Sequence, residues 1–279
     1  MPPNLALVYI AGFLRALGIG LTGVILGIYL SRAGLSATAI GLVIGAGLAG
    51  AAAGTLLVSL RADQLGRRNT LVALSLLGCV GGGGVALAGA LPGFALLAFL
   101  GMLNGMGRDR GPAFSLDQAI LADIARPERR TWVMAWYNVL LDAGHALGAL
   151  AGALPFVFRE RLAVDLLASY KLTFGLCAAL SLLSGTVYLF LTTRIEAAPA
   201  PNGVPGGASK ISPHSKKIVA RLASLIAVDA LGGGFLTSAL LAYWFFRRFG
   251  VSEAGLGPLF FAARLLNACS HPLAAWLAH

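Results

Sequence analysis

Charged and titratable side chains interrupt most of the long apolar runs of this 279-residue chain. An ionised group at the centre of a bilayer costs at least about 2.5 kcal/mol, so each such side chain must face a partner, water or a bound molecule. Arginine can bind an anion, while aspartate and histidine can pair with arginine or carry a proton. The candidates for a substrate and proton pathway are therefore Arg15, Arg108, Asp109, Arg110, Asp142, His145, Asp229 and Arg264.

Polar residues of the fifth apolar run share one helix face. Asn138, Asp142 and His145 are spaced i, i+4 and i+7, which places them on one side of a helix. Asp142 and His145 can relay protons in this position, because chains of Asp and His do so inside transporters. A structural hydrogen bond between helices is an equally good interpretation of the same pattern.

The eighth apolar run has a matching polar face. Arg264, Asn267 and His271 are spaced i, i+3 and i+7. At a rise of about 1.5 Å per residue, the polar groups of the two runs lie at similar depths. We therefore expect the two faces to meet, with Asp142 or His145 within side-chain reach of Arg264.

The triplet Arg108-Asp109-Arg110 lies near the middle of the fourth run. Consecutive residues of a helix diverge by about 100°, so the three side chains cannot all face one cavity. Local pairing of Asp109 would leave one arginine for a substrate. The alternative is that the helix ends at Gly107 and the triplet is a loop, which leaves too short an apolar helix to span a bilayer.

The composition indicates a membrane protein. Hydrophobic residues make up 58% of the chain and charged residues 11%, and the mean hydropathy is +0.82. A soluble domain has roughly 25% charged residues. The net charge of +10 comes from basic residues between the apolar runs, so we expect contact with the membrane surface and not with nucleic acid.

The sequence contains no motif typical of an enzyme or of a cofactor site. It lacks HExxH, GxSxG, clustered catalytic acids and the Cys/His spacing of zinc sites. Its three cysteines lie inside apolar runs and suggest neither disulfides nor metal ligands. We expect no enzymatic activity, no metal and no cofactor.

Eight apolar runs are long enough to cross a hydrocarbon layer about 30 Å thick, which takes about 20 helical residues. Only helices can do so here, because an open sheet would leave unpaired backbone groups in lipid. The predicted all-α spans are residues 5–30, 36–60, 70–91, 94–122, 131–156, 169–193, 218–246 and 254–278. Small residues at four-residue spacing predict close helix packing: Gly12, Ala16 and Gly20; Gly41, Gly45 and Ala49; Gly144, Gly148 and Gly152.

The distribution of basic residues predicts the orientation. The connections after the second, fourth and sixth spans carry more Arg and Lys than the opposite connections, which places both termini in the cytoplasm. The Pro-, Gly- and Ser-rich stretch within 195–217 reads as a flexible cytoplasmic linker. It divides the chain into residues 1–194, with six spans, and residues 218–279, with two.

The first span recurs after the linker. "LRALGIGLTG" and "VDALGGGFLT" align so that Arg15 falls on Asp229, and the following turns align Gly34 with Gly250 and Gly41 with Gly257. Parallel repeats of this kind relate the two halves of some secondary transporters. We expect Arg15 and Asp229 to approach each other across the central cavity in at least one state. The alternative is that each is satisfied within its own half, Arg15 by Asp109 or Asp142.

Residues 59–68, "SLRADQLGRR", resemble a signature of the major facilitator superfamily, Gly-x-x-x-Asp-Arg/Lys-x-Gly-Arg-Arg/Lys. The stretch "ADIARPERR" resembles the basic segment after the fourth helix of the same superfamily. Ser59 replaces the first glycine of the signature, and Gln64 replaces the basic residue after the aspartate. The matching positions are Asp63, Gly66, Arg67 and Arg68.

The resemblance implies a fold of twelve helices, of which this chain has the first six-helix half and the first two helices of the second half. Either the chain is a fragment, or the other four helices are supplied otherwise. The resemblance also implies that Asp63 and its neighbours form a latch that stabilises one access state. The alternative is a solvated turn with an Asp63–Arg67 pair at i, i+4.

The function implied is proton-coupled secondary transport of a small molecule by rocking of two halves around a midplane site. The arginines favour an anionic or amphiphilic substrate, unless Asp109, Asp142 and Asp229 balance them. "GHALGALAG" partly resembles the antiporter motif of the superfamily, without its proline and final glycine, and hints at efflux from a plasma or inner membrane. The alternatives are a truncated scaffold that does not transport, and an intramembrane enzyme.

Overall fold

The computed structural model describes residues 3–103, 105–196, 213–234 and 236–277. Most of the predicted linker lies outside the described residues, and so do the side chains of Asp229 and His271. Among the described residues every regular element is a helix. The helices are α1 (Pro3–Arg32), α2 (Ala37–Leu65), α3 (Arg67–Val85), α4 (Leu91–Leu100), α5 (Pro112–Ile124), α6 (Arg130–Ala151), α7 (Leu154–Leu162), α8 (Leu166–Leu189), α9 (Pro213–Gly234), α10 (Ser238–Phe249) and α11 (Glu253–Leu277), with short 3₁₀ turns at Pro127–Arg129 and Thr193–Ile195.

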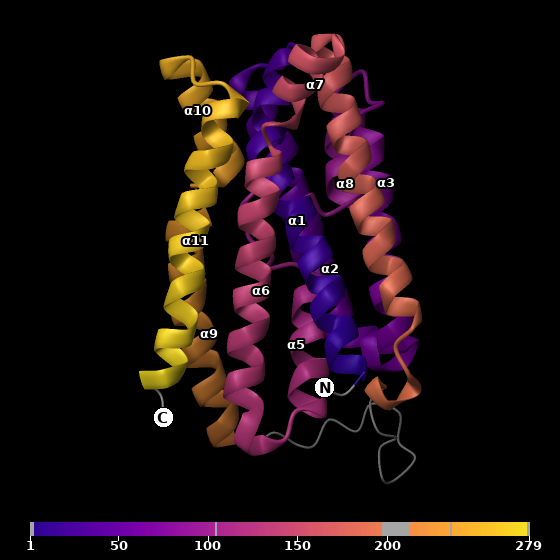
Figure 1. The fold of residues 1–279 in the computed structure, drawn as a ribbon. Coiled ribbons are helices and arrows are strands. Elements are labelled where there is room, and N and C mark those ends of the chain that lie inside the picture. Colours follow the sequence, from indigo (N-terminus) through magenta and orange to yellow (C-terminus); the bar gives the residue numbers. More distant parts are fainter. Residues whose placement is uncertain (1–2, 104, 197–212, 235, 278–279) are drawn as a thin grey trace.

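The helices form an elongated bundle around α1 (Figure 1). α1 packs against α6, α8 and α10, while α3 packs against α8 and α2 against α4. α11 packs along α6 and so connects the part of the chain after the linker to the part before it. α1 begins and α11 ends at the same end of the bundle, which we call the N-terminal end; the opposite end carries α7 and is called the α7 end.

The apolar core is divided into two clusters along the bundle. The cluster toward the α7 end joins the C-terminal part of α1 to α10 and α11 through Ala239, Ala242 and Leu256. The cluster toward the N-terminal end contains residues between Leu5 and Ile195 only. The parts of the chain before and after the linker therefore share a core at the α7 end.

The fourth predicted span, 94–122, is not one helix. α4 ends at Leu100 and α5 begins at Pro112, and the backbone of the described residues between them is irregular. Gly101, Gly105, Gly107 and Gly111 occur in this stretch and disfavour a helix, and Pro112 can only begin one, because it has no N–H. Gly107 adopts φ +63°, in the left-handed region. The expected continuous helix is wrong, and the triplet at 108–110 lies among the described non-helical residues 101–103 and 105–111, which we call the segment 101–111.

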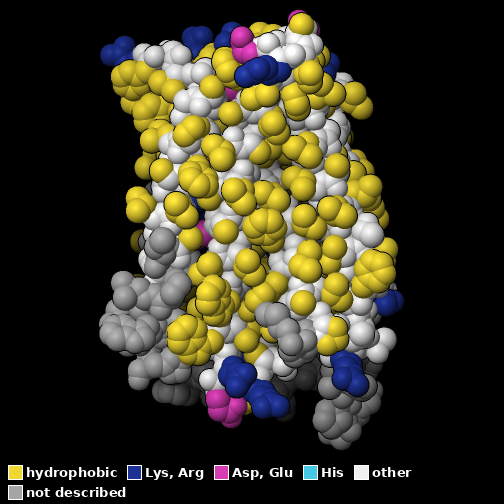
Figure 2. Space-filling view, viewed as in Figure 1, with side chains coloured by type: hydrophobic (Ala, Val, Ile, Leu, Met, Phe, Trp, Pro, Cys, Tyr) yellow, Lys and Arg dark blue, Asp and Glu magenta, His cyan; other side chains and the backbone are white. Residues whose placement is uncertain are grey.

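Four helical stretches are long and apolar enough to cross a membrane. They are Pro3–Arg32, Ala37–Leu65, Pro127–Leu162 and Leu166–Leu189, found by searching the described residues alone. The remaining predicted spans are shorter, interrupted or less apolar, so the count of eight is not confirmed. Figure 2 shows apolar side chains over the flank of the bundle and charged side chains gathered at its two ends, as expected of a protein surrounded by lipid.

Candidate functional site

The centre of the site is a buried cluster around Arg15, on the middle of α1. Its guanidinium forms ion pairs with Asp109 (Nε–Oδ2, 2.6 Å) and Asp117 (Nη2–Oδ2, 2.7 Å). It also donates to the hydroxyl of Tyr137 at 3.2 Å and to that of Tyr188. The two tyrosines donate in turn to Asp117, at 2.7 and 2.9 Å. Both carboxylates are almost fully buried, so these contacts replace the water that the charges have lost.

The cluster holds one cation and two carboxylates. The two carboxylates share one guanidinium, so the ionised cluster carries one net negative charge. A bound proton would bring the net charge of Arg15, Asp109 and Asp117 to zero.

Sequence reasoning missed Asp117, Tyr137 and Tyr188. Asp117 lies in the predicted span 94–122 and has an exposed fraction of 0%. Asp117 is a charged residue within an apolar run, as Arg15 is, so the same criterion could have selected it. The tyrosines gave no such signal, since a tyrosine is common in a core.

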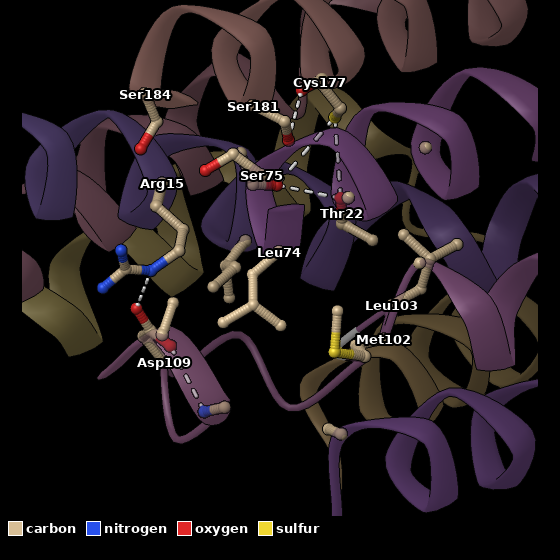
Figure 3. Close-up of a pocket in the computed structure, with 18 of the residues that line it drawn as sticks. Arg15, Thr22, Leu74, Ser75, Met102, Leu103, Asp109, Cys177, Ser181 and Ser184 are labelled. Atoms are coloured by element: carbon tan, nitrogen blue, oxygen red, sulfur yellow. Dashed lines mark hydrogen bonds and ion pairs between the residues drawn. The ribbon is translucent and has the colours of Figure 1, made fainter. Parts of the chain in front are cut away.

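A cavity of about 110 Å³ adjoins the cluster and is lined by α1, α2, α3, α5, α8 and the segment 101–111 (Figure 3). Arg15 and Asp109 close one end of it, and Leu74, Met102 and Leu103 line its apolar wall. Its hydroxyl and thiol groups are those of Thr22, Ser75, Ser181, Ser184 and Cys177. A single water molecule needs about 10–15 Å³ of such a cavity, so there is room for several water molecules beside the Arg15–Asp109 ion pair.

Asp109 connects this cluster to the polar face of α6. Its backbone N–H donates to Nε2 of His145 at 3.0 Å. Nδ1 of His145 lies 3.5 Å from Oδ1 of Asp142, and Oδ2 of Asp142 accepts from the amide of Asn267 at 2.6 Å. A continuous polar chain thus runs from Arg15 in α1 to Asn267 in α11.

The expected meeting of the polar faces of the fifth and eighth runs is found. Asn267 of α11 bonds to Asp142 of α6, and His145 and Arg264 line one small cavity. Arg264 donates to the carbonyl oxygen of Met106 at 3.2 Å. The backbone of the segment 101–111 therefore supplies a partner for Arg264 that the helical prediction could not include.

Arg15 is satisfied within the first part of the chain in this conformation, partly as the stated alternative expected. Asp109, one of the two partners that the alternative named, pairs with Arg15, and Asp117 is a second partner that it did not name. The side chain of Asp229 lies outside the described residues, so its approach to Arg15 stays a prediction.

The motif at 63–68 forms a second charged cluster, at the N-terminal end. Gly66 has φ +87° and allows the tight turn between α2 and α3. Arg67 pairs with Asp63 at 2.8 Å, as one interpretation of the motif expected, and also with Asp123 of α5 at 2.6 Å. Burial lowers the pKa of the Arg67 guanidinium, but hydrogen bonds to Asp123 and Asp63 outweigh burial and raise it.

Glu196 completes this second cluster. Its carboxylate accepts from the backbone N–H groups of Arg67 (2.6 Å) and Arg68 (3.2 Å). These groups are in the first turn of α3 and have no acceptor within the helix itself. Sequence reasoning missed both Glu196 and Asp123. The cluster joins α2, α3, α5 and the 3₁₀ turn after α8 within the first part of the chain. That it acts as a latch for one access state stays a prediction.

At the α7 end, an ion pair joins the two parts of the chain. Arg159 of α7 pairs with Glu253, the first residue of α11, and donates to Ser169 at 3.2 Å. Glu253 is 1% exposed. The guanidinium of Arg32, at the end of α1, lies 4.8 Å from the ring centre of Phe246 in α10. Both contacts hold the α7 end together.

We expect Glu253→Gln to loosen the α7 end. Truncating one partner of a buried pair leaves the other charge unpaired, which is strongly destabilising. The measurement is the labelling rate of Ala239→Cys, a position on α10 that is buried against α1, by a membrane-impermeant thiol reagent. A several-fold faster rate is expected. Glu160→Gln removes an exposed carboxylate from the same end and is the control; equal rates in the two variants would contradict the prediction.

Comparison with known proteins agrees with the geometry. The family model described as Major Facilitator Superfamily matches residues 8–279. An uncharacterized membrane protein, YJR124C of Saccharomyces cerevisiae, is 26% identical over an alignment of 302 residues, covering 96% of this chain and 66% of that protein. The chain thus spans about two thirds of the length of this relative.

Two solved structures share the fold. The human organic anion transporter MFSD10 (TETRAN) superposes with a TM-score of 0.64 at 20% identity, covering 99% of this chain and 72% of that one. A D-xylose-proton symporter superposes with a TM-score of 0.65 at 16% identity, covering 96% and 66%. The family match points to an integral membrane transporter and not to an enzyme. From the match over residues 8–279 and the helical fold that it shares with these two structures, this chain belongs to the major facilitator superfamily.

Proposed function

We propose that this chain forms the first half and the first two helices of the second half of a proton-coupled secondary transporter. The units are residues 1–194 and 218–279, joined by the linker at 195–217, with the N-terminal end in the cytoplasm of a plasma or inner membrane. Alternating access would arise by rocking of the two halves about a midplane site.

The arrangement of contacts between the two parts supports this proposal. At the α7 end they share an apolar core, the Arg159–Glu253 ion pair and the Arg32–Phe246 contact. At the N-terminal end the described side chains of α9 between 217 and 228 are exposed. A transporter closed at one face of the membrane and open at the other has this distribution of contacts.

The observation that carries proton coupling is the surplus carboxylate beside Arg15. Asp109 and Asp117 share one guanidinium in a buried site, next to a cavity large enough for water. A proton that binds there removes a buried negative charge and loosens the attraction to Arg15. Proton binding would in this way change the strength of a contact between α1 and the segment that leads to α5.

The proposed substrate is a small organic anion. A cavity of about 140 Å³ is lined by Arg108, Arg110, the amides of Asn138 and Asn267, and the ring of Phe114. Its acidic groups have partners of their own, since Asp109 pairs with Arg15 and Asp142 accepts from Asn267. The neighbour MFSD10 is named as an organic anion transporter.

The test is uptake into proteoliposomes that contain the purified protein. Radiolabelled aliphatic and aromatic carboxylates are supplied with and without a pH gradient, and neutral sugars serve as the comparison class. We expect gradient-dependent transport of at least one carboxylate. Transport of sugars alone would overturn the assignment of an anion, and transport that ignores the gradient would overturn proton coupling.

We expect Arg110, which is exposed and lines the cavity of about 140 Å³, to contribute to binding of the anion. Arg110→Gln removes a charged donor, and hydrogen bonds to charged groups contribute about 1.5–3 kcal/mol. The KM for the anion should rise about tenfold or more, with a smaller change in kcat. Arg161→Gln, at an exposed arginine of α7, is the matched control and should leave KM unchanged.

A further inference from the structure

His145 is buried, and both of its ring nitrogens are placed by the structure. The side chain is 3% exposed. Nε2 accepts the backbone N–H of Asp109 at 3.0 Å, and a nitrogen that accepts a hydrogen bond carries no proton. The single proton of the neutral ring is therefore on Nδ1, which lies 3.5 Å from Oδ1 of Asp142. Nδ1 has no hydrogen-bond partner among the described residues.

The residue that donates to His145 belongs to a segment held on two sides. On the side of the first half, the carboxylate of Asp109 pairs with Arg15. On the other side, the carbonyl of Gly105 accepts from the N–H of Ala239 at 2.9 Å, at the start of α10. The segment 101–111 thus lies between the two halves and is bonded to both.

Met106 and Gly107 strengthen the contact with the second half. The carbonyl of Met106 accepts from Ser238 Oγ at 2.8 Å and from Arg264 at 3.2 Å. A Cβ on Gly107 would lie 2.8 Å from Ser238 Oγ, so the backbone itself touches the first turn of α10. Movement of the segment by even an ångström would break these contacts.

A second proton on His145 is incompatible with this arrangement. Protonation at Nε2 would place an N–H opposite the N–H of Asp109, two donors with no acceptor between them. The hydrogen bond is lost, and the backbone of Asp109 must move or leave its amide unpaired in a buried site. Because the segment is short, displacement at Asp109 is transmitted to Met106 and Gly105.

The charged groups around His145 come from three packed elements and from its own helix. Asp142 is on the same helix and favours the imidazolium, as does Asp109, although Asp109 is already paired with Arg15. Arg264 of α11 shares one cavity with His145, and Arg108 and Arg110 of the segment share another. The positive charges of these arginines oppose the imidazolium. The full set is Arg15 of α1, Arg108, Asp109 and Arg110 of the segment, Asp142 of α6 and Arg264 of α11.

We propose that His145 takes up a proton at Nε2 during the transport cycle and that the imidazolium releases the segment 101–111 from α10 and α11, so that the α7 end opens. The neutral ring holds the segment in place and keeps this end closed. The inference rests on the proposed function for its place in a cycle, but the switch itself needs no substrate. Since protonation opens the α7 end, this end should be closed at high pH and open at low pH.

The experiment measures the width of the α7 end as a function of pH. Spin labels on Leu162→Cys in α7 and Arg248→Cys in α10, both exposed positions, report the distance between the halves in the purified protein with its native cysteines replaced by serine. The titration runs from about pH 8 to about pH 5, the range in which imidazoles change charge. The expected result is a shift of the distance distribution from a short to a long component as the pH falls.

Two variants on the same helix decide which group is responsible. In His145→Gln the amide oxygen can still accept from Asp109 but cannot take a proton, so the distance should stay short at every pH. In Asp142→Asn the switch should remain, with its midpoint at lower pH, because the carboxylate that favours the imidazolium is gone. A switch that persists in His145→Gln, or one that is lost in Asp142→Asn, would overturn the proposal, and so would a distance that does not change with pH in the parent protein.

Hydrogen exchange gives a second measurement that a purely structural role of His145 would not affect. After correction for the intrinsic pH dependence, amides of residues 101–111 should lose protection at low pH in the parent protein and keep it in His145→Gln. Protection that falls equally in both proteins would count against the proposal. Neither measurement needs transport. A failure of anion uptake would therefore overturn the proposed function and leave the pH switch standing. A failure of the pH switch would overturn this inference and leave the proposed function standing.

Discussion

Replacing Arg15 with alanine is expected to lower the free energy of unfolding by about 3–5 kcal/mol and to abolish proton-coupled uptake. The substitution leaves Asp109 and Asp117 buried without a cation, so the cost of removing both carboxylates from water is no longer offset. It also removes the donor that positions the hydroxyls of Tyr137 and Tyr188. Thermal unfolding of the detergent-solubilised protein measures the loss of stability, and proteoliposome uptake measures the loss of coupling.

A double-mutant cycle separates the ion pair from other effects of the substitution. Asp117→Ala alone should be similarly destabilising, because it leaves the tyrosines without an acceptor. The double variant should cost clearly less than the sum of the two single variants, since the partners are in contact. Arg161→Ala, at an exposed arginine in α7, controls for loss of a positive charge and should leave the unfolding temperature unchanged. Additive costs in the cycle would mean that the Arg15–Asp117 contact is not the source of the stability.

The sequence allowed the fold class and the central charged residues to be predicted because both depend on composition and on local spacing. Arg15 and Asp109 were noticed as charges within apolar runs, and the polar face of α6 was visible at helical spacing. Their partners could not be assigned in this way. Arg15 and Asp117 are 102 positions apart in the chain, and only the packing of α1 against α5 brings them together.

The break at 101–111 shows where a reliable rule gave the wrong answer. A helix that ends at Gly107 is too short to span a bilayer, and a continuous helix was expected for that reason. The chain resumes a helix at Pro112, so α4 and α5 are two short helices joined by an irregular segment. Irregular backbone is tolerated inside the bundle because it is buried in protein and its carbonyls are bonded to α10 and α11.

The glycine spacing was predictive for α1 and α6 but not for the start of α2. A Cβ on Gly20 would lie 2.2 Å from the carbonyl oxygen of His145, and one on Gly148 would lie 2.1 Å from that of Leu17. Gly41 and Gly45 have nothing within 4 Å of an added Cβ. The same small-residue pattern thus marks a helix contact in one place and an open surface in another, and the residues of the pattern alone do not distinguish them.

Gly148→Ala is therefore expected to be strongly destabilising although it adds a single methyl group. The backbones of α1 and α6 touch at this position, and a methyl group cannot fit until the helices separate. Overpacking of this kind costs about 1–3 kcal/mol, and separation would also displace His145, one turn earlier on α6, from the N–H of Asp109. Thermal unfolding should shift down by several degrees, and the pH-dependent opening of the α7 end should be weakened.

Gly45→Ala is the matched control, because it makes the same chemical change in a helix where the added methyl group meets nothing. Alanine is favoured over glycine inside a helix by about 1 kcal/mol, so this variant should be as stable as the parent protein or slightly more stable. Helix propensity favours alanine at both positions. An opposite change in stability for the two substitutions would therefore come from close packing at Gly148. A Gly148→Ala protein as stable as Gly45→Ala would show that α1 and α6 are not in backbone contact, and it would remove the support that holds His145 against the segment 101–111.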